Sequence, residues 1–275
     1  MNDASKASTI GAVTGLFSGL TGVGGGPILV SLMVAVLGIN QRRAQGTTPV
    51  IILPVALLGA TLYIVQGIGD RARFDTPLAL ALIPAIAVPS IAGVSIGATW
   101  MAALPTSQLR RAFGVFLFLV AFSMLTRGIL PIGTPDGAYV PVPFIFWFML
   151  GFVTGVLSGL LGVGGAMIII PFMTLGAGIS QYMTQGISLA IVSITAIAGT
   201  WVHYKLGNVD LRCVKRIAPA ALIAVIVSSL LAGNLDGFWL TKFFGLTVAY
   251  FGYRFTFLSE TSKPALASPG DMYHI

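Results

Sequence analysis

The chain has 275 residues, of which 56% are hydrophobic and only 8% are charged. An ordinary soluble domain carries about 25% charged residues, so this composition excludes that class and indicates an integral membrane protein. The net charge is +7. We assign it to loops that set membrane topology and not to nucleic-acid binding, because the sequence has no pattern of basic and aromatic residues for that purpose. The single cysteine, Cys213, excludes an intrachain disulfide and a thiolate metal cluster.

Four apolar stretches fill the first half of the chain. The first, 8–38, is too long for one simple span and contains Gly-Val-Gly-Gly-Gly-Pro at residues 22–27. The others lie at 47–66, 77–104 and 112–126. Continuous runs of about 20 apolar residues predict spanning helices. They are unlike the alternating strands of an outer-membrane barrel.

The second half repeats this order after a segment rich in glycine and proline. That segment, residues 129–143, is the predicted linker between the halves. Apolar stretches follow at 144–175, with a second glycine cluster inside, and at 187–204, 217–233 and 238–258. We therefore divide the chain into an N-terminal repeat, 8–128, a C-terminal repeat, 144–258, and a polar tail, 259–275, that we expect to be disordered.

The two halves are copies of one unit. The segment that begins at Gly11 matches the segment that begins at Gly151, 140 residues later, at positions that include Gly11, Gly15, Ser18, Gly19, Leu20, Gly22, Val23, Gly24 and Gly25. The same register pairs Gln45 with Gln185. We predict an all-α polytopic membrane protein of two repeats, each with four apolar segments, or about eight transmembrane helices in all. Duplicated halves with matching broken helices are typical of transporters, whose substrate site lies near the middle of the membrane.

The glycine cluster of each half predicts a break or a re-entrant turn in its first helix. The first helix should end near Thr21 and restart near Pro27, because proline suits the first turn of a helix. Free N–H groups at the restart, with the helix dipole, form a site for an anion. The alternative is a glycine-lined packing notch without a ligand. The candidate residues are Gly24, Gly25, Gly26 and Pro27 in the first half and Gly164, Gly165 and Ala166 in the second.

Polar side chains open the second apolar segment of each half. Gln45, Thr47 and Thr48 in the first half correspond in position to Gln185 and Ser188 in the second. Amides and hydroxyls at a helix start either cap the backbone or donate to a ligand, and both interpretations stay open.

The glycines spaced four apart, Gly11, Gly15 and Gly19, favour close helix packing. His203 aligns with Tyr63, and the pair is a candidate for proton handling or for a simple interfacial role.

The positions of the acidic residues narrow the choice of ligand. All eight carboxylates lie in predicted loops or tails, whereas cation and proton-coupled carriers commonly carry one inside the membrane. A neutral cavity with N–H and hydroxyl donors suits a small anion better. The sequence has no paired carboxylates or nucleophile–base set, so we expect neither an enzyme nor a metal site nor a cofactor.

The paired glycine motifs resemble the signatures of the sulfite exporter TauE/SafE family, also called the 4-toluene sulfonate uptake permease group. They are Gly-Leu-Phe-Ser-Gly-Leu-Thr-Gly-Val-Gly-Gly-Gly-Pro from residue 15 and Gly-Val-Leu-Ser-Gly-Leu-Leu-Gly-Val-Gly-Gly-Ala-Met from residue 155. The resemblance extends over residues 8–258 and implies a secondary transporter of the bacterial inner membrane with a four-plus-four repeat. It implies substrates such as sulfite, thiosulfate, sulfoacetate or another organosulfonate. Ala166 and Met167 depart from the pattern of the first copy, which has Gly26 and Pro27.

We therefore expect a carrier that moves a small sulfur-containing anion by alternating access, with the anion and the lipid bilayer as its partners. A carrier for another small solute and a non-transporting membrane assembly partner are the alternatives, and a homo-oligomer stays open.

If every stretch spans once, ten Lys and Arg lie on the N-terminal side and five lie opposite. If the glycine stretches are re-entrant hairpins, the ratio is eleven to four and the halves are inverted. Both versions place the two termini in the cytoplasm.

Overall fold

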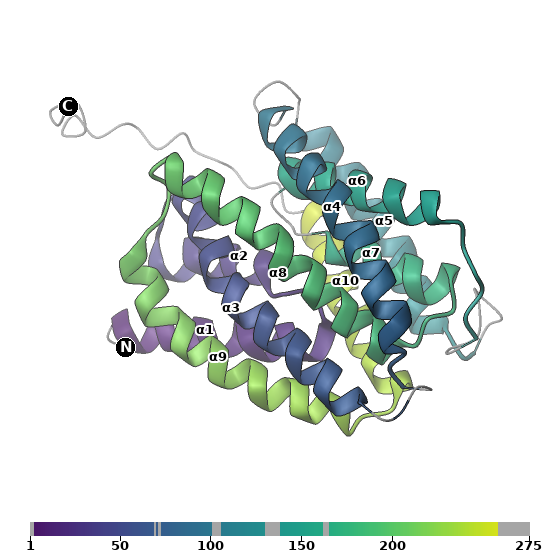
Figure 1. Ribbon diagram of the computed structural model, residues 1–275. Coiled ribbons are helices and arrows are strands. Elements are labelled where there is room, and N and C mark those ends of the chain that lie inside the picture. The colour runs from purple at the N-terminus through teal and green to yellow at the C-terminus, as the bar shows by residue number, and fades with distance from the viewer. Residues whose placement is uncertain are drawn as a thin grey trace, which may run out of the picture.

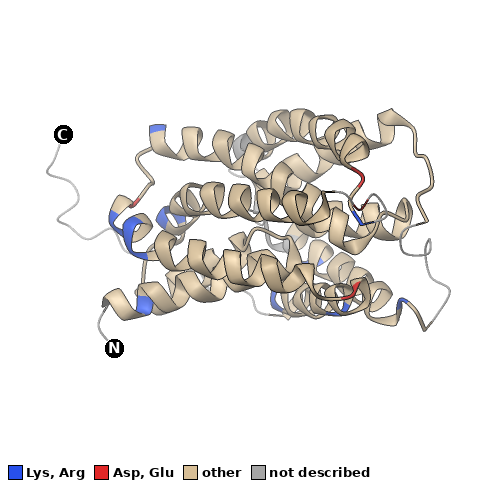
Figure 2. Ribbon diagram, turned by 60° about the horizontal axis from the view of Figure 1, so that its bottom comes forward, with Lys and Arg blue, Asp and Glu red and all other residues tan. Residues whose placement is uncertain are grey.

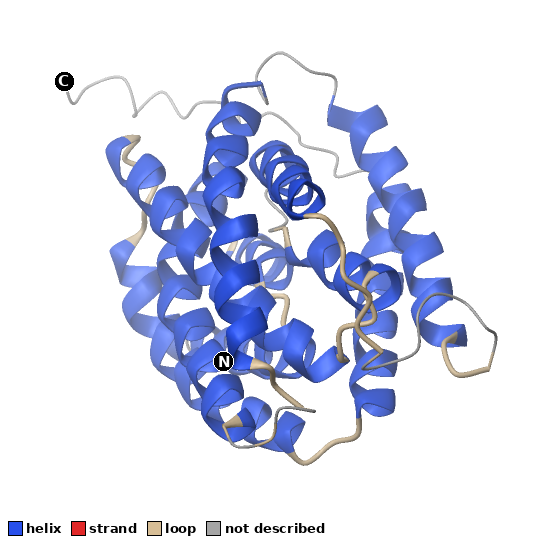
Figure 3. Cartoon of the chain, turned by 45° about the vertical axis from the view of Figure 1, so that its right-hand side comes forward, coloured by secondary structure: helices blue, strands red, loops and turns tan. Residues whose placement is uncertain are grey.

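The chain folds as a bundle of helices (Figure 1). The computed structural model describes residues 3–68, 70, 73–100, 106–129, 138–161 and 165–257. Within these residues all regular structure is helical and there is no β-strand (Figure 3). The helices are α1 (Asp3–Thr21), α2 (Gly26–Leu37), α3 (Gln41–Gly67), α4 (Thr76–Trp100), α5 (Thr106–Thr126), α6 (Phe144–Leu161), α7 (Ala166–Pro171), the π-helix η1 (Phe172–Gly176), α8 (Gln181–Lys205), α9 (Leu211–Gly233) and α10 (Gly237–Phe257).

Four of these helices are long and apolar enough to cross a membrane: α3, α4, α8 and α9. Two of them run through internal prolines, Pro49 and Pro54 in α3 and Pro84 and Pro89 in α4. Proline is tolerated in membrane helices where neighbouring groups satisfy the freed backbone carbonyls. The apolar runs therefore form helices despite residues that would break a helix in water.

The glycine clusters interrupt the first helix of each half, as the sequence predicts. In the first half α1 ends at Thr21 and α2 begins at Gly26, which confirms both expected bounds. In the second half α6 ends at Leu161 and α7 begins at Ala166, while residues 162–164 lie outside the described chain. The predicted tail and most of the predicted linker, residues 130–137, also lie outside it.

The glycine stripe of α1 serves close packing against α9. A side chain added at Gly11 would collide with the Ile217 carbonyl, and one at Gly15 would collide with the Ala221 carbonyl. The small residues let the two backbones meet. The equivalent stripe of α6 meets α4 in the same way, and Gly151 lies against Ile86. The opening helix of each half thus packs, in parallel, against α9 or α4 of the other half.

Helices that correspond in the two halves run in opposite directions where they meet. Near one end of the α3–α8 pair Gly199 lies against Pro49, and near the other Gly186 lies against Tyr63. α3 and α8 are therefore antiparallel. The pair α5 and α10 is antiparallel too, since Gly114 lies against Thr256 and Gly245 lies against Leu125.

These directions define two ends of the molecule. We call the end where α1, α3, α5 and α9 begin the basic end, and the end where α4, α6, α8 and α10 begin the opposite end. Figure 2 shows Lys and Arg gathered at the end that carries the N-terminus. By helix direction, the described cations of the basic end are Lys6, Arg42, Arg43, Arg111, Lys205, Arg212, Lys215, Arg216 and Arg254, while the opposite end has Arg73, Arg127 and Lys242.

Candidate functional site

The turn between α1 and α2 is built from backbone shapes that favour glycine. Gly22, Gly24 and Gly25 have φ angles of 71°, 77° and 73°, in the left-handed region that penalises a side chain. Gly25 is the N-cap of α2, and Pro27 stands in its first turn. All of residues 22–27 are buried. A helix therefore begins inside the protein, as the sequence predicts.

The start of α2 leaves backbone donors unpaired. Gly22 N–H donates to the Ser18 carbonyl at 3.0 Å, and Leu29 N–H donates to the Gly25 carbonyl at 2.9 Å. Between them, the N–H groups of Gly24, Gly25 and Gly26 form no hydrogen bond within the described chain. The dipole of α2 adds partial positive charge at the same point. This arrangement is the usual backbone site for an anion.

The chain reverses at this turn, so α2 returns beside α1. A side chain added at Gly25 would lie 2.6 Å from Thr14 Cγ2, which stands on α1. Gly24 lies beside Ile52 and Val192, near the middle of α3 and α8, at 3.5 Å and 2.8 Å from a Cβ built at the glycine. The turn is therefore a re-entrant hairpin whose tip lies midway along the two longest central helices.

One face of α8 covers the hairpin tip. Gly22 lies against the Gln185 side chain, with a built Cβ 2.7 Å from Gln185 Cα, and Gly24 lies against Val192. Ser188 stands between these two positions on the helix, about one turn from each, so it belongs to the same face. The glycine turn and the face of α8 that bears Gln185 and Ser188 therefore pack together through Gly22–Gln185 and Gly24–Val192, although they belong to different halves.

A hydrogen-bond network fixes Gln185. The Tyr63 hydroxyl donates to Gln185 Oε1 at 2.7 Å and lies 2.6 Å from the Gly19 carbonyl, while Gln185 Nε2 donates to the Leu20 carbonyl at 3.1 Å. The Tyr182 hydroxyl donates to the Tyr63 carbonyl at 3.2 Å. This network ties α1, α3 and α8 together immediately beside the glycine turn.

Other buried polar groups at the same face have no partner. The hydroxyls of Ser188 and Thr184 and the amide of Gln181 are fully buried and form no hydrogen bond. The hydroxyl of Ser18, whose carbonyl receives the Gly22 N–H, is also buried and unpaired. A buried polar group without a partner costs free energy, about 1–3 kcal/mol, unless something else satisfies it. These groups, next to unpaired backbone N–H donors, mark the candidate substrate site.

The first-half counterparts have different surroundings. Gln45 is half-buried, and Thr48 donates to its own helix at the Ala44 carbonyl, at 2.7 Å. Thr47 accepts a hydrogen bond from the Asp210 N–H at 3.0 Å, which ties α3 to the loop before α9. These three residues lie in the first turns of α3, toward the basic end, because α3 and α8 run in opposite directions. Thr48 is the nearest of them to the glycine turn, since it stands one turn before Ile52, which lies beside Gly24.

The second glycine turn differs from the first in its described part. Gly165 has φ −69°, an ordinary right-handed value, and a Cβ built on it would meet Thr154 Cβ at 3.2 Å. Ala166 begins α7 and is fully buried. Gly164, the remaining predicted residue of this turn, lies outside the described chain.

Tyr63 and His203, aligned in the repeat, lie at different ends of the helix pair. Tyr63 packs at the start of α8, whereas His203 is half-buried in the last turn of α8, with Nδ1 unpaired. The sequence names Tyr63 only as a candidate for proton handling, and its position beside Gln185 follows from the antiparallel packing of α3 and α8. The sequence gave no role to Tyr182, Gln181 or Thr184. Thr184 has no polar counterpart in the repeat, because residue 44 is alanine, while Gln181 has an identical counterpart in Gln41.

Asp210, in the loop after α8, caps the N-terminus of α9 with its carboxylate. Asp210 Oδ1 accepts the N–H groups of Arg212 and Cys213 at 2.9 Å and 3.1 Å. Partial burial raises the pKa of the Asp210 carboxyl, but these hydrogen bonds, with the Arg212 charge, bring the pKa below its ordinary value. Asp210 thus caps α9 and, through its N–H, holds Thr47 of the other half.

Long apolar helices, a re-entrant turn inside the bundle and buried donors beside it define a multi-pass membrane transport protein. A family model for the sulfite exporter TauE/SafE matches residues 2–124 and 147–272. The chain belongs to the sulfite exporter TauE/SafE family, whose members are membrane transporters.

Named relatives agree with this class. The chain is 26% identical over 232 residues to the "Probable membrane transporter protein YjnA" of Bacillus subtilis, covering 80% of this chain and 87% of that protein. It is 23% identical over 232 residues to YunE of the same organism, covering 77% and 82%. A "Probable membrane transporter protein" of Haemophilus influenzae is 30% identical over 109 residues, which span 37% of this chain and 41% of that protein. No solved structure matches the chain.

Proposed function

We propose that the protein is a secondary transporter for a small sulfur-containing anion such as sulfite, thiosulfate, sulfoacetate or another organosulfonate. The observation that carries the proposal is the buried start of α2. Its unpaired N–H groups belong to a turn that packs against the side of α8 that bears the unpaired Ser188 hydroxyl. The family description supports the sulfur chemistry.

The chemistry of the site suits an oxyanion. A sulfonate or sulfite presents three oxygens, and each can accept from a separate N–H or O–H donor. Such charge-assisted hydrogen bonds are strong, particularly away from bulk water. The helix end supplies about half a positive charge without a buried arginine. Among the described carboxylates, Asp3 is the first residue of α1, at the basic end, and Asp70, Asp75, Asp210 and Asp236 lie outside the helices, so none of them opposes an anion at this depth.

Alternating access would arise from movement of one half against the other. The contacts α1–α9 and α6–α4 are equivalent in the two copies, and the pairs α3–α8 and α5–α10 join helices of matching position in opposite directions. We infer an inverted repeat with a pseudo-two-fold axis in the membrane plane, as in many carriers. The substrate site then lies between α1–α2 of one half and α8 of the other, where rocking would change its exposure.

The charge distribution supports a bacterial inner-membrane orientation with both termini in the cytoplasm. The helix directions correspond to the re-entrant version of the topology, which gives eleven Lys and Arg against four. A cytoplasmic reporter fused after Ile275 should be active and a periplasmic reporter inactive. An active periplasmic reporter would reverse the orientation.

The direct test is counterflow in proteoliposomes that contain only this protein. Labelled sulfite, thiosulfate and sulfoacetate are each tested against their unlabelled forms, with an amino acid and a divalent cation as other solutes. Exchange of at least one sulfur anion, with none of the other solutes, would support the proposal. Exchange of another solute alone would support the different-solute carrier. No exchange, with folded protein in the vesicles, would favour the assembly partner.

A further inference from the structure

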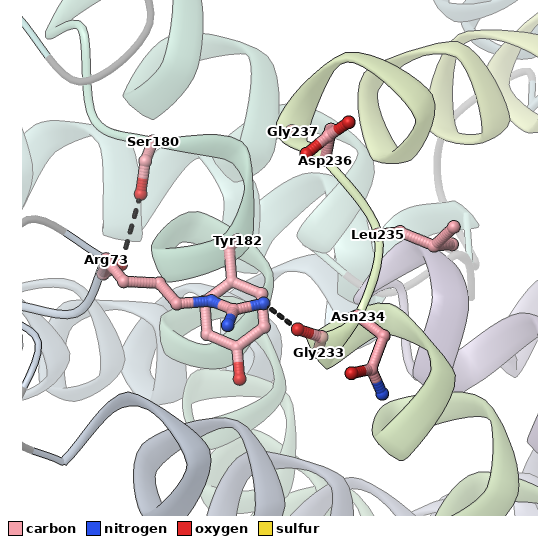
Figure 4. A pocket seen from close by; sticks show the side chains of 8 residues that line it. All are labelled: Arg73, Ser180, Tyr182, Gly233, Asn234, Leu235, Asp236 and Gly237. Carbon is pink, nitrogen blue, oxygen red and sulfur yellow. Dashed lines mark hydrogen bonds between the residues drawn. The ribbon is translucent and has the colours of Figure 1, made fainter.

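A pocket of about 340 Å³ lies at the opposite end of the bundle (Figure 4). It is formed by the loop before α4, the start of α8 and the turn between α9 and α10. The residues that define its chemistry are Arg73, Ser180, Tyr182 and Asp236, with the chain from Gly233 to Gly237. The pocket is larger than one sulfite or sulfonate needs, so an anion could enter with part of its water shell.

Arg73 is held in a fixed orientation in this pocket. Its guanidinium lies 4.3 Å from the centre of the Tyr182 ring, and Nη2 donates to the Gly233 carbonyl. The Ser180 hydroxyl donates to the Arg73 carbonyl at 3.3 Å. One bond to a carbonyl leaves other N–H donors of the planar group available. A guanidinium that is stacked and anchored in this way is preorganised for an oxyanion.

The other described cations of this end are used inside the protein. Arg127 is buried and donates from Nη2 to the Thr174 carbonyl at 3.0 Å. Lys242 donates to the carbonyls of Leu125 and Arg127, the latter at 3.0 Å. Arg73, by contrast, lines the pocket described above.

We propose that Arg73 and this pocket form an entry site that captures the sulfur anion before it reaches the glycine turn. The inference rests on the proposed function. The Tyr182 ring supports Arg73, its hydroxyl bonds to Tyr63, and Tyr63 bonds to Gln185 beside the turn. The entry site and the central site thus share one chain of contacts. The N-termini of α8 and α10, which adjoin the pocket, add partial positive charge.

Asp236 opposes capture and gives the proposal an internal control. Its carboxylate lines the same pocket but points away from Arg73 in Figure 4, and no ion pair joins the two among the described residues. Neutralising Asp236 should therefore strengthen anion capture, while neutralising Arg73 should weaken it. Both effects should decrease at high salt, because exposed charges are screened.

The experiment measures the KM and maximal rate of transport, with substrate added from the side that carries the pocket. Arg73→Gln should raise KM about fivefold with little change in rate, from the loss of one unit charge about 4 Å from the anion in water. Arg73→Lys should recover part of this loss and Asp236→Asn should lower KM. Tyr182→Leu, which removes the support of Arg73, should raise KM more than Tyr182→Phe, which keeps the ring.

The outcomes separate this inference from the proposed function. Wild-type protein without exchange of any sulfur anion would overturn both. Wild-type exchange with an unchanged KM in Arg73→Gln would overturn the entry site alone. A lower maximal rate at constant KM, equal in Arg73→Gln and Arg73→Lys, would also overturn it, because Arg73 would then act only through its link to Gly233. A rise in KM that disappears at high salt would support capture by charge.

Discussion

The two glycine turns have similar sequences and different backbones. The first turn has three glycines with positive φ, and its unpaired N–H groups lie where the turn packs against α8. In the second turn Gly165 has an ordinary right-handed conformation and leads into a helix of six residues followed by a π-helix. The two copies therefore differ in backbone conformation at the aligned glycines Gly25 and Gly165.

The two halves contribute different groups to the candidate site. The first turn packs against Gln185 and Val192 of the second half, on the face of α8 that also bears Ser188, so the candidate site is shared between the two copies. The corresponding residues of the first half, Gln45 and Thr48, lie toward the basic end, outside the network of Tyr63. A site that uses unlike contributions from two copies allows one half to be altered independently of the other, and the following predictions use that property.

The largest expected effect is the difference in transport between alanine substitutions in the first and the second glycine turn. Gly25→Ala should reduce transport at least tenfold, because a left-handed backbone costs about 1–2 kcal/mol for a residue with a side chain and its Cβ would lie 2.6 Å from Thr14. Gly165→Ala should retain transport, since its φ is −69° and its nearest neighbour is at 3.2 Å. Initial rates in proteoliposomes, corrected for inserted protein, measure both. Equal losses would mean that the two turns act alike.

The next prediction concerns a hydroxyl without a partner. Ser188→Ala should leave the melting temperature of the ligand-free protein unchanged or higher, because its hydroxyl makes no hydrogen bond in the protein. Affinity for the anion should fall about 10–100-fold, the range expected from losing a hydrogen bond to a charged group worth about 1.5–3 kcal/mol. Thr48→Val is the matched control, since Thr48 donates only to its own helix. Thermal shifts on titration with the transported anion provide the measurement, and equal losses in the two variants would place Ser188 outside the site.

The third prediction compares the two aligned glutamines. Gln185→Leu should destabilise the protein by about 1–3 kcal/mol, because the Leu20 carbonyl loses its donor and the Tyr63 hydroxyl loses an acceptor in a buried site. Gln45→Leu should have a smaller effect, since Gln45 is half-buried. Denaturation in detergent compares the two. A greater loss for Gln45→Leu would mean that the network described around Gln185 is not the stabilising one.

The sequence predicted the break and its bounds because glycine and proline act locally on the backbone. It also predicted the close packing of Gly11 and Gly15, since the spacing of small residues is itself the packing signal. It did not decide between parallel and inverted halves, because repeat alignment carries no information on helix direction. Consequently Tyr63 was compared with its aligned partner His203, whereas the antiparallel pairing places Tyr63 beside Gln185. Arg73 gave no signal, as its stacking on Tyr182 is a contact between distant segments.

The smallest expected effect concerns the loops that follow α3 and α8, where Asp70 and Asp210 are aligned. Asp210 accepts two backbone N–H groups by its side chain and donates its own N–H to Thr47, whereas Asp70 accepts one, from Arg73. The pKa of the Asp210 carboxyl is lowered in the folded protein, despite its partial burial, by those hydrogen bonds and the Arg212 charge. The ionised form thus stabilises the fold at pH values above the unfolded-state pKa of about 3.9. That contribution decreases as the pH falls through the lower folded-state value.

Asp210→Asn should therefore change stability little at pH 7, because asparagine is also a good N-cap. It should flatten the fall in melting temperature between about pH 5 and pH 3, the interval that brackets the ordinary carboxyl pKa. In Asp70→Asn the melting temperature should still decrease over this interval by more than in Asp210→Asn, since Asp70 accepts only one backbone N–H. Melting curves across this interval for the wild type and both variants make the comparison. If Asp210→Asn and the wild type lost stability in parallel as the pH decreased, the cap of α9 would not depend on the charge of the Asp210 carboxylate.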